Sequence, residues 1–168
     1  MSFFLDEMEA CVPALRRYAR ALTHDRDRAD DLVQDCLERA IRKSSLWRPT
    51  GPLRAWLFRI LLNLHRNEIR RDRRTPAAFP IDALPLEPPS PAAQTDRLAL
   101  ADTARAMQKL SIEQREALLL VALEGMSYAE AAGVLDIPVG TLMSRVGRAR
   151  ENLRSLTENG QPHLRSIK

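Results

Sequence analysis

The 168-residue chain has no apolar run approaching the roughly 20 residues that a membrane-spanning helix needs. Its first residues, MSFFLDEMEACV, lack the basic start and the long apolar stretch of a secretory signal peptide. We therefore expect a cytoplasmic protein without membrane insertion. Apolar residues make up 45% of the chain, an ordinary share for a soluble protein, and the length suits one domain or two small ones.

Cysteine and histidine are scarce, with two and three residues, and none of them forms a C-x-x-C or H-x-x-x-H pair. Cys36 lies on an apolar helical stripe, which favours a buried structural thiol over a redox or metal role. The chain also lacks a glycine-rich phosphate loop and any local serine–histidine–aspartate motif. The sequence therefore predicts no catalytic residue, no metal, no cofactor and no enzyme, although a triad assembled only by folding would leave no local motif.

No segment has the pattern of a β-strand, so we expect an all-α fold. Six of the eleven prolines fall between Thr75 and Ala93, where no helical period is visible. This stretch predicts a linker over 75–93 that joins two small helical domains, 1–74 and 94–160, and a tail follows at 161–168. A coil of this length spans about 25 Å on average, so we expect that the two domains can sit far apart.

The first domain is predicted to contain several helices. A short helix from Ser2 to about Glu9 is followed by one that opens near Pro13. The next begins after Asp25, a plausible N-cap, and its apolar stripe predicts a long amphipathic helix. That stripe contains Leu32, Val33, Cys36, Leu37, Ala40 and Ile41.

The face opposite that stripe is acidic. Six acids stand against two arginines from Asp25 to Glu38, a local charge of −4. A solvated face with acids placed favourably near the helix N-terminus explains this charge, and it is the interpretation we favour from the residues alone. The alternative is a docking face for a basic partner.

A third helix, about Leu53–Arg73, follows a loop that carries Trp47. Seven arginines stand against two acids between Leu53 and Arg74, a local charge of +5. Some basic residues near a helix C-terminus are favourable for the helix dipole alone. Five in nine residues exceed that need and suit a phosphate backbone, and the Trp47 indole could stack on an unpaired base.

The second domain is predicted to contain two capping boxes. Ser111 with Gln114 opens a helix that runs to Glu124, with Leu118, Leu119 and Ala122 facing inward, and Gly125 ends it. Ser127 with Glu130 opens the next helix.

A tight turn at Asp136, which must tolerate a left-handed backbone, then leads to a basic helix from about Pro138. Leu142, Val146, Ala149 and Leu153 form the buried stripe of this last helix. A short helix, a tight turn and a basic helix are typical of a helix-turn-helix that binds the DNA major groove. An ordinary helical hairpin with a solvated basic face is the alternative.

Three segments, in this order, resemble a sigma factor of bacterial RNA polymerase of the small extracytoplasmic-function group. DRADDLVQDCLERA resembles its clamp-binding segment, and GPLRAWLFRILLNLHRNEIRR resembles its minus-10 recognition and melting helix. LSIEQREALLLVALEGMSYAEAAGVLDIPVGTLMSRVGRARENLR resembles its minus-35 domain. MSYAEAAGVLDIPVGTLMSR is also similar to the general-stress subgroup. Asp136 departs from the Gly that many members have, which puts the geometry of the turn in question.

The resemblance implies three sets of site residues. Core polymerase would contact the acidic face at Asp30, Asp31, Gln34, Asp35 and Glu38. The minus-10 element would be read, with bases flipped out of the stack, by Trp47, Arg48, Arg59, Asn63, Arg66, Asn67 and Arg70. The minus-35 element would be read in the major groove by Thr141, Met143, Ser144, Arg145, Gly147 and Arg148.

The partners implied by the resemblance are core RNA polymerase, promoter DNA and an anti-sigma factor that controls the chain. A free sigma factor of this kind would be a monomer. Two other classes of function stay open at this point. One is a dimeric helix-turn-helix regulator that binds a palindrome. The other is a mimic that titrates an anti-sigma factor, although the length leaves no room for the receiver domain that such mimics usually carry.

Overall fold

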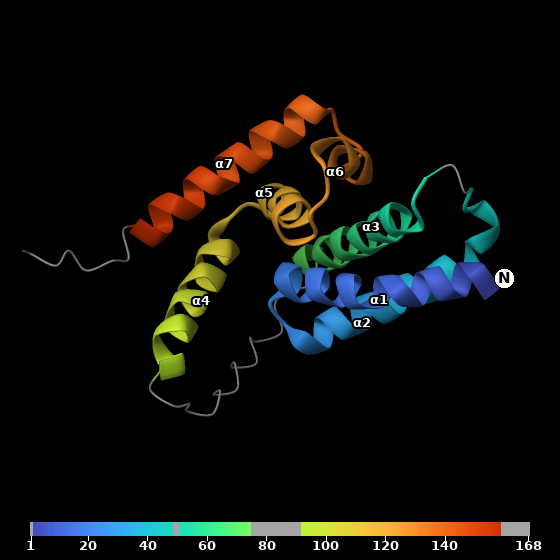
Figure 1. Ribbon diagram of the computed structural model, residues 1–168, viewed down its shortest axis with the longest axis horizontal. Coiled ribbons are helices and arrows are strands. Elements are labelled where there is room, and N and C mark those ends of the chain that lie inside the picture. The colour runs from blue at the N-terminus through green and yellow to red at the C-terminus, as the bar shows by residue number, and fades with distance from the viewer. Residues whose placement is uncertain (1, 49–50, 75–91, 159–168) are drawn as a thin grey trace, which may run out of the picture.

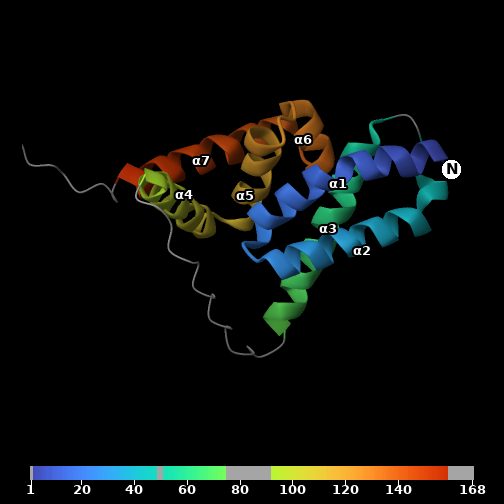
Figure 2. The ribbon, with the colours of Figure 1, turned by 60° about the horizontal axis from the view of Figure 1, so that its bottom comes forward.

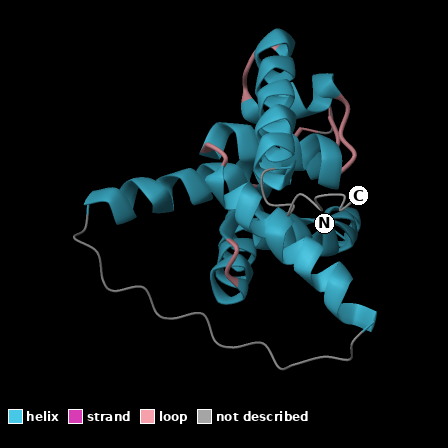
Figure 3. Ribbon diagram, turned by 90° about the vertical axis from the view of Figure 1, so that its left-hand side faces the viewer, coloured by secondary structure: helices cyan, strands magenta, loops and turns pink. Residues whose placement is uncertain are grey.

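The computed structural model describes residues 2–48, 51–74 and 92–158, and every regular element within these ranges is helical (Figures 1 and 3). The predicted all-α fold is confirmed. Residues 75–91 of the predicted linker and the whole predicted tail, 161–168, lie outside the described residues.

The N-terminal half contains three long helices, α1 (Ser2–Thr23), α2 (Arg26–Arg42) and α3 (Leu53–Arg74), with a short 3-10 turn at Ser44–Leu46. Each of the three helices contacts the other two. The predicted N-cap is confirmed, because the Asp25 carboxylate accepts hydrogen bonds from the first backbone amides of α2. The core between the helices is formed by Leu15, Tyr18, Leu22, Leu32, Leu57, Phe58 and Leu61.

The prediction of a helix break at Pro13 is wrong, because α1 runs unbroken from Ser2 to Thr23. Pro13 is exposed, and it removes only one backbone donor from the helix. Phe4 and Met8 before it are buried on the same side of the helix as Leu15 after it. Packing of this continuous apolar stripe therefore outweighs the local penalty of the proline.

The C-terminal half contains α4 (Ala92–Lys109), α5 (Ile112–Leu118), α6 (Tyr128–Leu135) and α7 (Val139–Glu158). The first two residues of α4 fall within the stretch predicted as linker, which was expected to end at residue 93. The Ser127–Glu130 capping box is confirmed in both directions, with bonds of 2.8 and 3.2 Å. Gly125 ends the preceding segment at φ 65°, a backbone conformation that suits glycine.

Two details of helical phase differ from the prediction. The helix expected to continue to Glu124 changes at Leu119–Leu123 into a π-helical segment, η2. The wider turn alters which residues face the core, so Ala122 is exposed rather than buried. Ile41, predicted on the buried stripe of α2, is 50% exposed because it lies in the last turn of that helix.

The two halves pack against each other. α3 contacts α6, and α1 contacts η2, so both helices contribute to the interface between the two halves (Figures 1 and 2). Buried residues from both halves form one contiguous apolar cluster. In this conformation the two halves are in direct contact, which does not test whether the linker lets them sit far apart.

Candidate nucleic-acid and polymerase interfaces

The last helix, α7, presents the predicted DNA-reading face to solvent. Leu142, Val146 and Ala149 are buried and Leu153 is partly buried, which confirms the predicted inward stripe. The opposite side contains the exposed side chains, with Met143 53% exposed. The exposed members of the predicted set are Thr141, Met143, Ser144, Gly147 and Arg148.

The turn before α7 has the geometry that a helix-turn-helix requires. Asp136 adopts the left-handed conformation at φ 55° and ψ 49°. Its backbone amide and that of Ile137 donate to carbonyls of the last turn of α6, with the second bond 3.1 Å long. Asp is among the few non-glycine residues that visit this conformation. The departure from Gly at this position therefore leaves the turn intact.

Arg145 differs from the other five residues of the predicted minus-35 set. It is half-buried and lines a polar groove of about 330 Å³ between α7 and α3. Three arginines of α3, at 66, 70 and 73, line the same groove. Arg145 therefore belongs to the recognition helix but lines a groove that the C-terminal half shares with the N-terminal half.

The predicted polymerase-binding face of α2 is exposed along its whole length. All five side chains, Asp30, Asp31, Gln34, Asp35 and Glu38, are exposed. Their ion pairs are long and solvated, at 3.8 Å from Arg20 to Asp30 and 3.6 Å from Arg42 to Glu38. Exposed pairs of this kind contribute ~0.2–1 kcal/mol or less each, so a basic partner could replace them.

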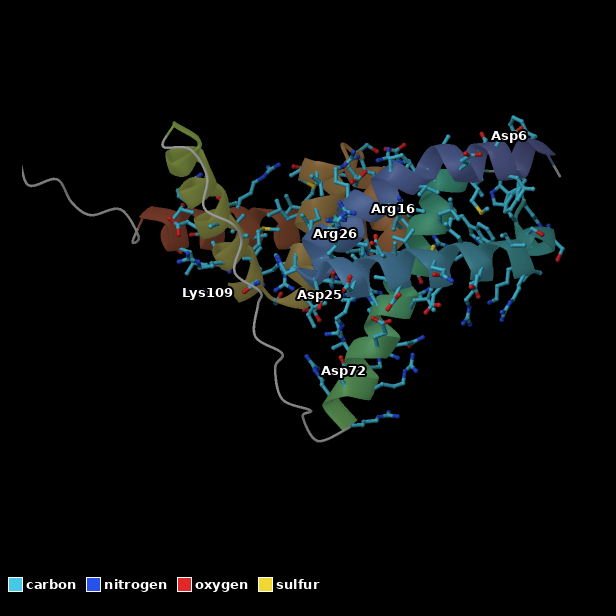
Figure 4. All side chains as sticks on the ribbon, turned by 90° about the horizontal axis from the view of Figure 1, so that it is seen from below. Asp6, Arg16, Asp25, Arg26, Asp72 and Lys109 are labelled. Carbon is cyan, nitrogen blue, oxygen red and sulfur yellow. The ribbon has the colours of Figure 1, made fainter. Side chains whose placement is uncertain are left out.

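The end of α3 carries a dense positive charge. Arg70, Arg73 and Arg74 are exposed there, and in Figure 4 this end, marked by Asp72, projects away from the rest of the molecule. Asp72 pairs with Arg28 of α2, which anchors one side of the helix end. Exposed guanidinium groups such as those of Arg70, Arg73 and Arg74 are of the kind that binds phosphate oxygens.

The predicted minus-10 residues divide into two groups. Arg48, Asn63, Asn67 and Arg70 are exposed. Trp47 is half-buried, with its ring centroid 5.7 Å from that of Phe4, so one part of the indole already packs against α1. A groove of about 480 Å³ opens beside it, lined by Arg48, Trp56 and Arg59 together with residues of α6.

Arg59 and Arg66 form the second group, because both bind the C-terminal half. Arg59 donates to the backbone carbonyl of Gly133 in α6. Arg66 donates to both carboxylate oxygens of Glu116 in α5, at 3.1 and 2.6 Å. Arg59 stays exposed and Arg66 is partly buried, so each has a partner in the C-terminal half while part of its side chain remains open to solvent.

Buried charges that were not predicted from the sequence join the two halves. The side chains of Glu116 and Glu124 are both 0% exposed, and Arg17 and Arg54 bind Glu124. Burial, reinforced by the nearby Glu116 carboxylate, raises the pKa of Tyr18 well above its usual value. The sequence did contain one signal. Glu116 lies four residues before Leu120 on an apolar helical stripe, a position that indicates a buried charge.

Three observations bear on other kinds of site or segment. Cys36 is buried, as predicted, and burial raises the pKa of its thiol to about 12, which disfavours the reactive thiolate. Among the described residues there is no group of three or more His, Cys, Asp or Glu that could hold a metal ion. No helix in the described ranges is long and apolar enough to span a membrane.

Comparison with known proteins gives matches in both halves. Residues 8–62 match the family described as the Sigma2 domain of PhyR, and residues 100–153 match the family described as Sigma-70, region 4. The curated ECF RNA polymerase sigma factor EcfG of Rhodopseudomonas palustris is 43% identical over 152 residues, which cover 90% of this chain and 83% of that protein.

Two solved structures share the fold over nearly the whole chain. The sigma factor RpoE of Bartonella quintana, solved with the anti-sigma factor NepR, has a TM-score of 0.79 and 35% identity, and the match covers 96% of this chain and 100% of that one. CnrH, solved with the cytosolic domain of CnrY, has a TM-score of 0.72 and 33% identity, covering 94% and 89%. The fold and both matched regions define a sigma-70-type protein, and within that class the chain belongs to the extracytoplasmic-function (ECF) RNA polymerase sigma factors.

Proposed function

We propose that this chain binds core RNA polymerase and directs promoter recognition, DNA melting and transcription initiation, with a defined face for each task. The exposed acids of α2 dock the polymerase clamp, and α7 reads the minus-35 element through Met143, Ser144, Gly147 and Arg148. The loop around Trp47 and the polar face of α3 read the minus-10 element. Residues 1–74 and 94–160 act as the two sigma domains, and 75–93 joins them.

One observation carries this proposal. The acidic face of α2 and the DNA-reading face of α7 are both exposed, on a chain that matches an ECF sigma factor over most of its length. A dimeric helix-turn-helix regulator would not need a separate acidic docking helix, so we propose a monomer when free. The relatives regulate transcription rather than catalyse reactions, and we propose that this chain, too, has no enzymatic activity and acts in the cytoplasm.

An anti-sigma factor is the proposed regulator of the chain. Two structural relatives were solved in complex with anti-sigma proteins, NepR and the cytosolic domain of CnrY. The 43% identity to EcfG supports a place in the general-stress subgroup, which small anti-sigma proteins control.

Run-off transcription tests the proposal. Purified chain is added to core polymerase on genomic promoter fragments, and discrete transcripts are expected only when both are present. The match to the Sigma2 domain of PhyR favours one competing candidate, a sigma mimic. A mimic would bind an anti-sigma factor yet produce no transcript and no complex with core polymerase, and that result would overturn the proposed function.

A further inference from the structure

Five charged residues join the two halves, and we call them the interdomain clasp: Arg17, Arg54, Arg66, Glu116 and Glu124. Arg17 and Arg54 each lie 2.8 Å from the same carboxylate oxygen of Glu124. Arg54 also donates to the backbone carbonyl of Glu124, at 2.8 Å. Arg66 binds Glu116 through two nitrogen atoms. All three arginines come from the N-terminal half, and both acids come from the C-terminal half.

Both carboxylates of the clasp are withdrawn from water. Their side chains are 0% exposed, so each depends on the arginines of the other half for compensation of its charge. The Tyr18 hydroxyl of α1 donates to the backbone carbonyl of Glu116, at 3.1 Å. Charge pairing and a buried hydrogen bond thus act at the same interface.

The closed arrangement covers part of the proposed minus-10 surface. The groove beside Trp47 is walled on its other side by Ala129 and Gly133 of α6. Arg59 binds the Gly133 carbonyl, and Arg66 belongs to the clasp. Of the seven residues proposed to read the minus-10 element, Arg59 and Arg66 are thus held by the domain proposed to read the minus-35 element.

This arrangement is incompatible with binding both promoter elements at once. Elements named for positions −10 and −35 are separated by about 25 base pairs, or ~85 Å at 3.4 Å per pair. In the structure, atoms of Arg66 and Glu116 lie 2.6 Å apart. The two halves must therefore separate before the chain can occupy a promoter.

We propose that the clasp is an autoinhibitory latch, which keeps the free chain closed with part of its minus-10 surface covered by its own minus-35 domain. This inference rests on the proposed function for the identity of the covered surface, but not for the existence of the latch. The faces of α2 and α7 lie outside the clasp and stay exposed, so polymerase can engage the closed chain. Separation then releases Arg59 and Arg66 for DNA.

Salt and the charges of the clasp are expected to control whether the chain is closed or open. Opening returns both carboxylates to water. The free energy that favours the closed state is therefore only the difference between pairing these charges and hydrating them. Salt screens the approach of charged groups and weakens partly exposed pairs, so rising NaCl favours opening. Neutralising the acids leaves the arginines without charged partners and shifts the balance in the same direction.

Small-angle X-ray scattering of the full chain tests the latch directly. The double variant Glu116→Gln with Glu124→Gln is compared with wild type and with a control, Asp102→Asn with Glu151→Gln, which removes two exposed acids from the same half. Loss of charge-assisted bonds is expected to shift the closed-to-open ratio by roughly tenfold, seen as a larger radius of gyration. The control is expected to match wild type, and circular dichroism verifies the helical content of each.

A second variant acts from the opposite side of the interface. Arg17→Gln with Arg54→Gln alters only the N-terminal half and spares every residue proposed to touch DNA. It is expected to expand the chain as the glutamate variant does. If either variant fails to fold, scattering of wild type in rising NaCl decides, with expansion expected.

The possible results distinguish a failure of the latch from a failure of the proposed function. Equal radii for wild type and folded variants, or a wild-type chain that is already expanded at low salt, would overturn the latch. Opened variants are also expected to initiate transcription at lower concentration, because apparent affinity scales with the fraction of competent chain. Opening without that gain would overturn its inhibitory role. Opening with no transcript from any form would refute the proposed function and leave the latch in place.

Discussion

Two arginines of α7 illustrate how the position of a side chain on a helix decides its role. Arg148 is exposed on the face opposite the buried stripe, beside Ser144 and Gly147. Arg154 is also exposed but lies a turn and a half further on, towards the helix end. We propose that the first reaches base edges and that the second contacts phosphate or solvent.

Arg148→Ala is expected to lower promoter use and to relax preference at one minus-35 base pair, because a bidentate arginine–guanine contact discriminates by ~1–3 kcal/mol. Arg154→Ala is expected to weaken binding evenly and to lower the salt slope by about one at most. Transcription from promoters substituted one base pair at a time distinguishes the two effects. An equal loss on every promoter with Arg148→Ala would mean that this residue only anchors phosphate.

His65 of α3 is expected to make stability depend on pH. It is 8% exposed, and its Nδ1 atom has no hydrogen-bond partner in the structure. Burial, followed by the charges of Arg115, Arg28 and Arg66, lowers its pKa from 6.5 to about 4. The unfolded chain therefore binds the proton more readily, and stability is lost as pH falls from 6.5 towards 4.

The free energy of unfolding is expected to drop by about 3 kcal/mol at most across that range on account of His65. Urea denaturation at a series of pH values measures the drop, and His65→Asn should remove this component. A variant with the same slope as wild type would assign the pH dependence to other groups.

At the scale of elements, α2 combines a buried stripe with an acidic face that no other described element covers. If this face docks the polymerase, reversing Asp31 and Glu38 to Lys should abolish binding to core polymerase, since like charges then repel at the interface. Helical content should stay unchanged because both side chains are exposed. Co-purification with core enzyme measures the effect.

The matched control for this reversal is Glu9→Lys with Glu151→Lys, which makes the same change in net charge on exposed residues outside α2. The control should bind polymerase as wild type does. Normal co-purification of the α2 variant would contradict the proposed contact between α2 and the polymerase clamp.

Features decided within one element were predictable from the sequence. The caps at Asp25 and Ser127, the left-handed Asp136 and the buried stripe of α7 depend on residues a few positions apart. The partners of Glu116 and Glu124 were not predictable, because they lie 50 to 107 residues away along the chain. Helix α1 was misjudged at Pro13 because tertiary packing, not local preference, decides its continuity.

At the scale of the whole molecule, an anti-sigma factor must act on a chain that already closes on itself. We expect a small partner that contacts both the α2 face and the C-terminal half, stabilising the closed form further. Affinity purification of the tagged chain across growth and stress conditions should recover such a protein. Recovery of polymerase alone under every condition would count against this form of control.

A chain that is closed when free must open to bridge two promoter elements on the polymerase. Energy transfer between dyes on Ser45→Cys and Tyr128→Cys tests this, since each residue is next to one that lines the groove between the halves. Cys11 is replaced by Ser, and Cys36 stays because it is buried and its pKa is about 12. Transfer should be high in the free chain and should fall sharply in the polymerase–promoter complex. The same transfer efficiency in both states would contradict the account.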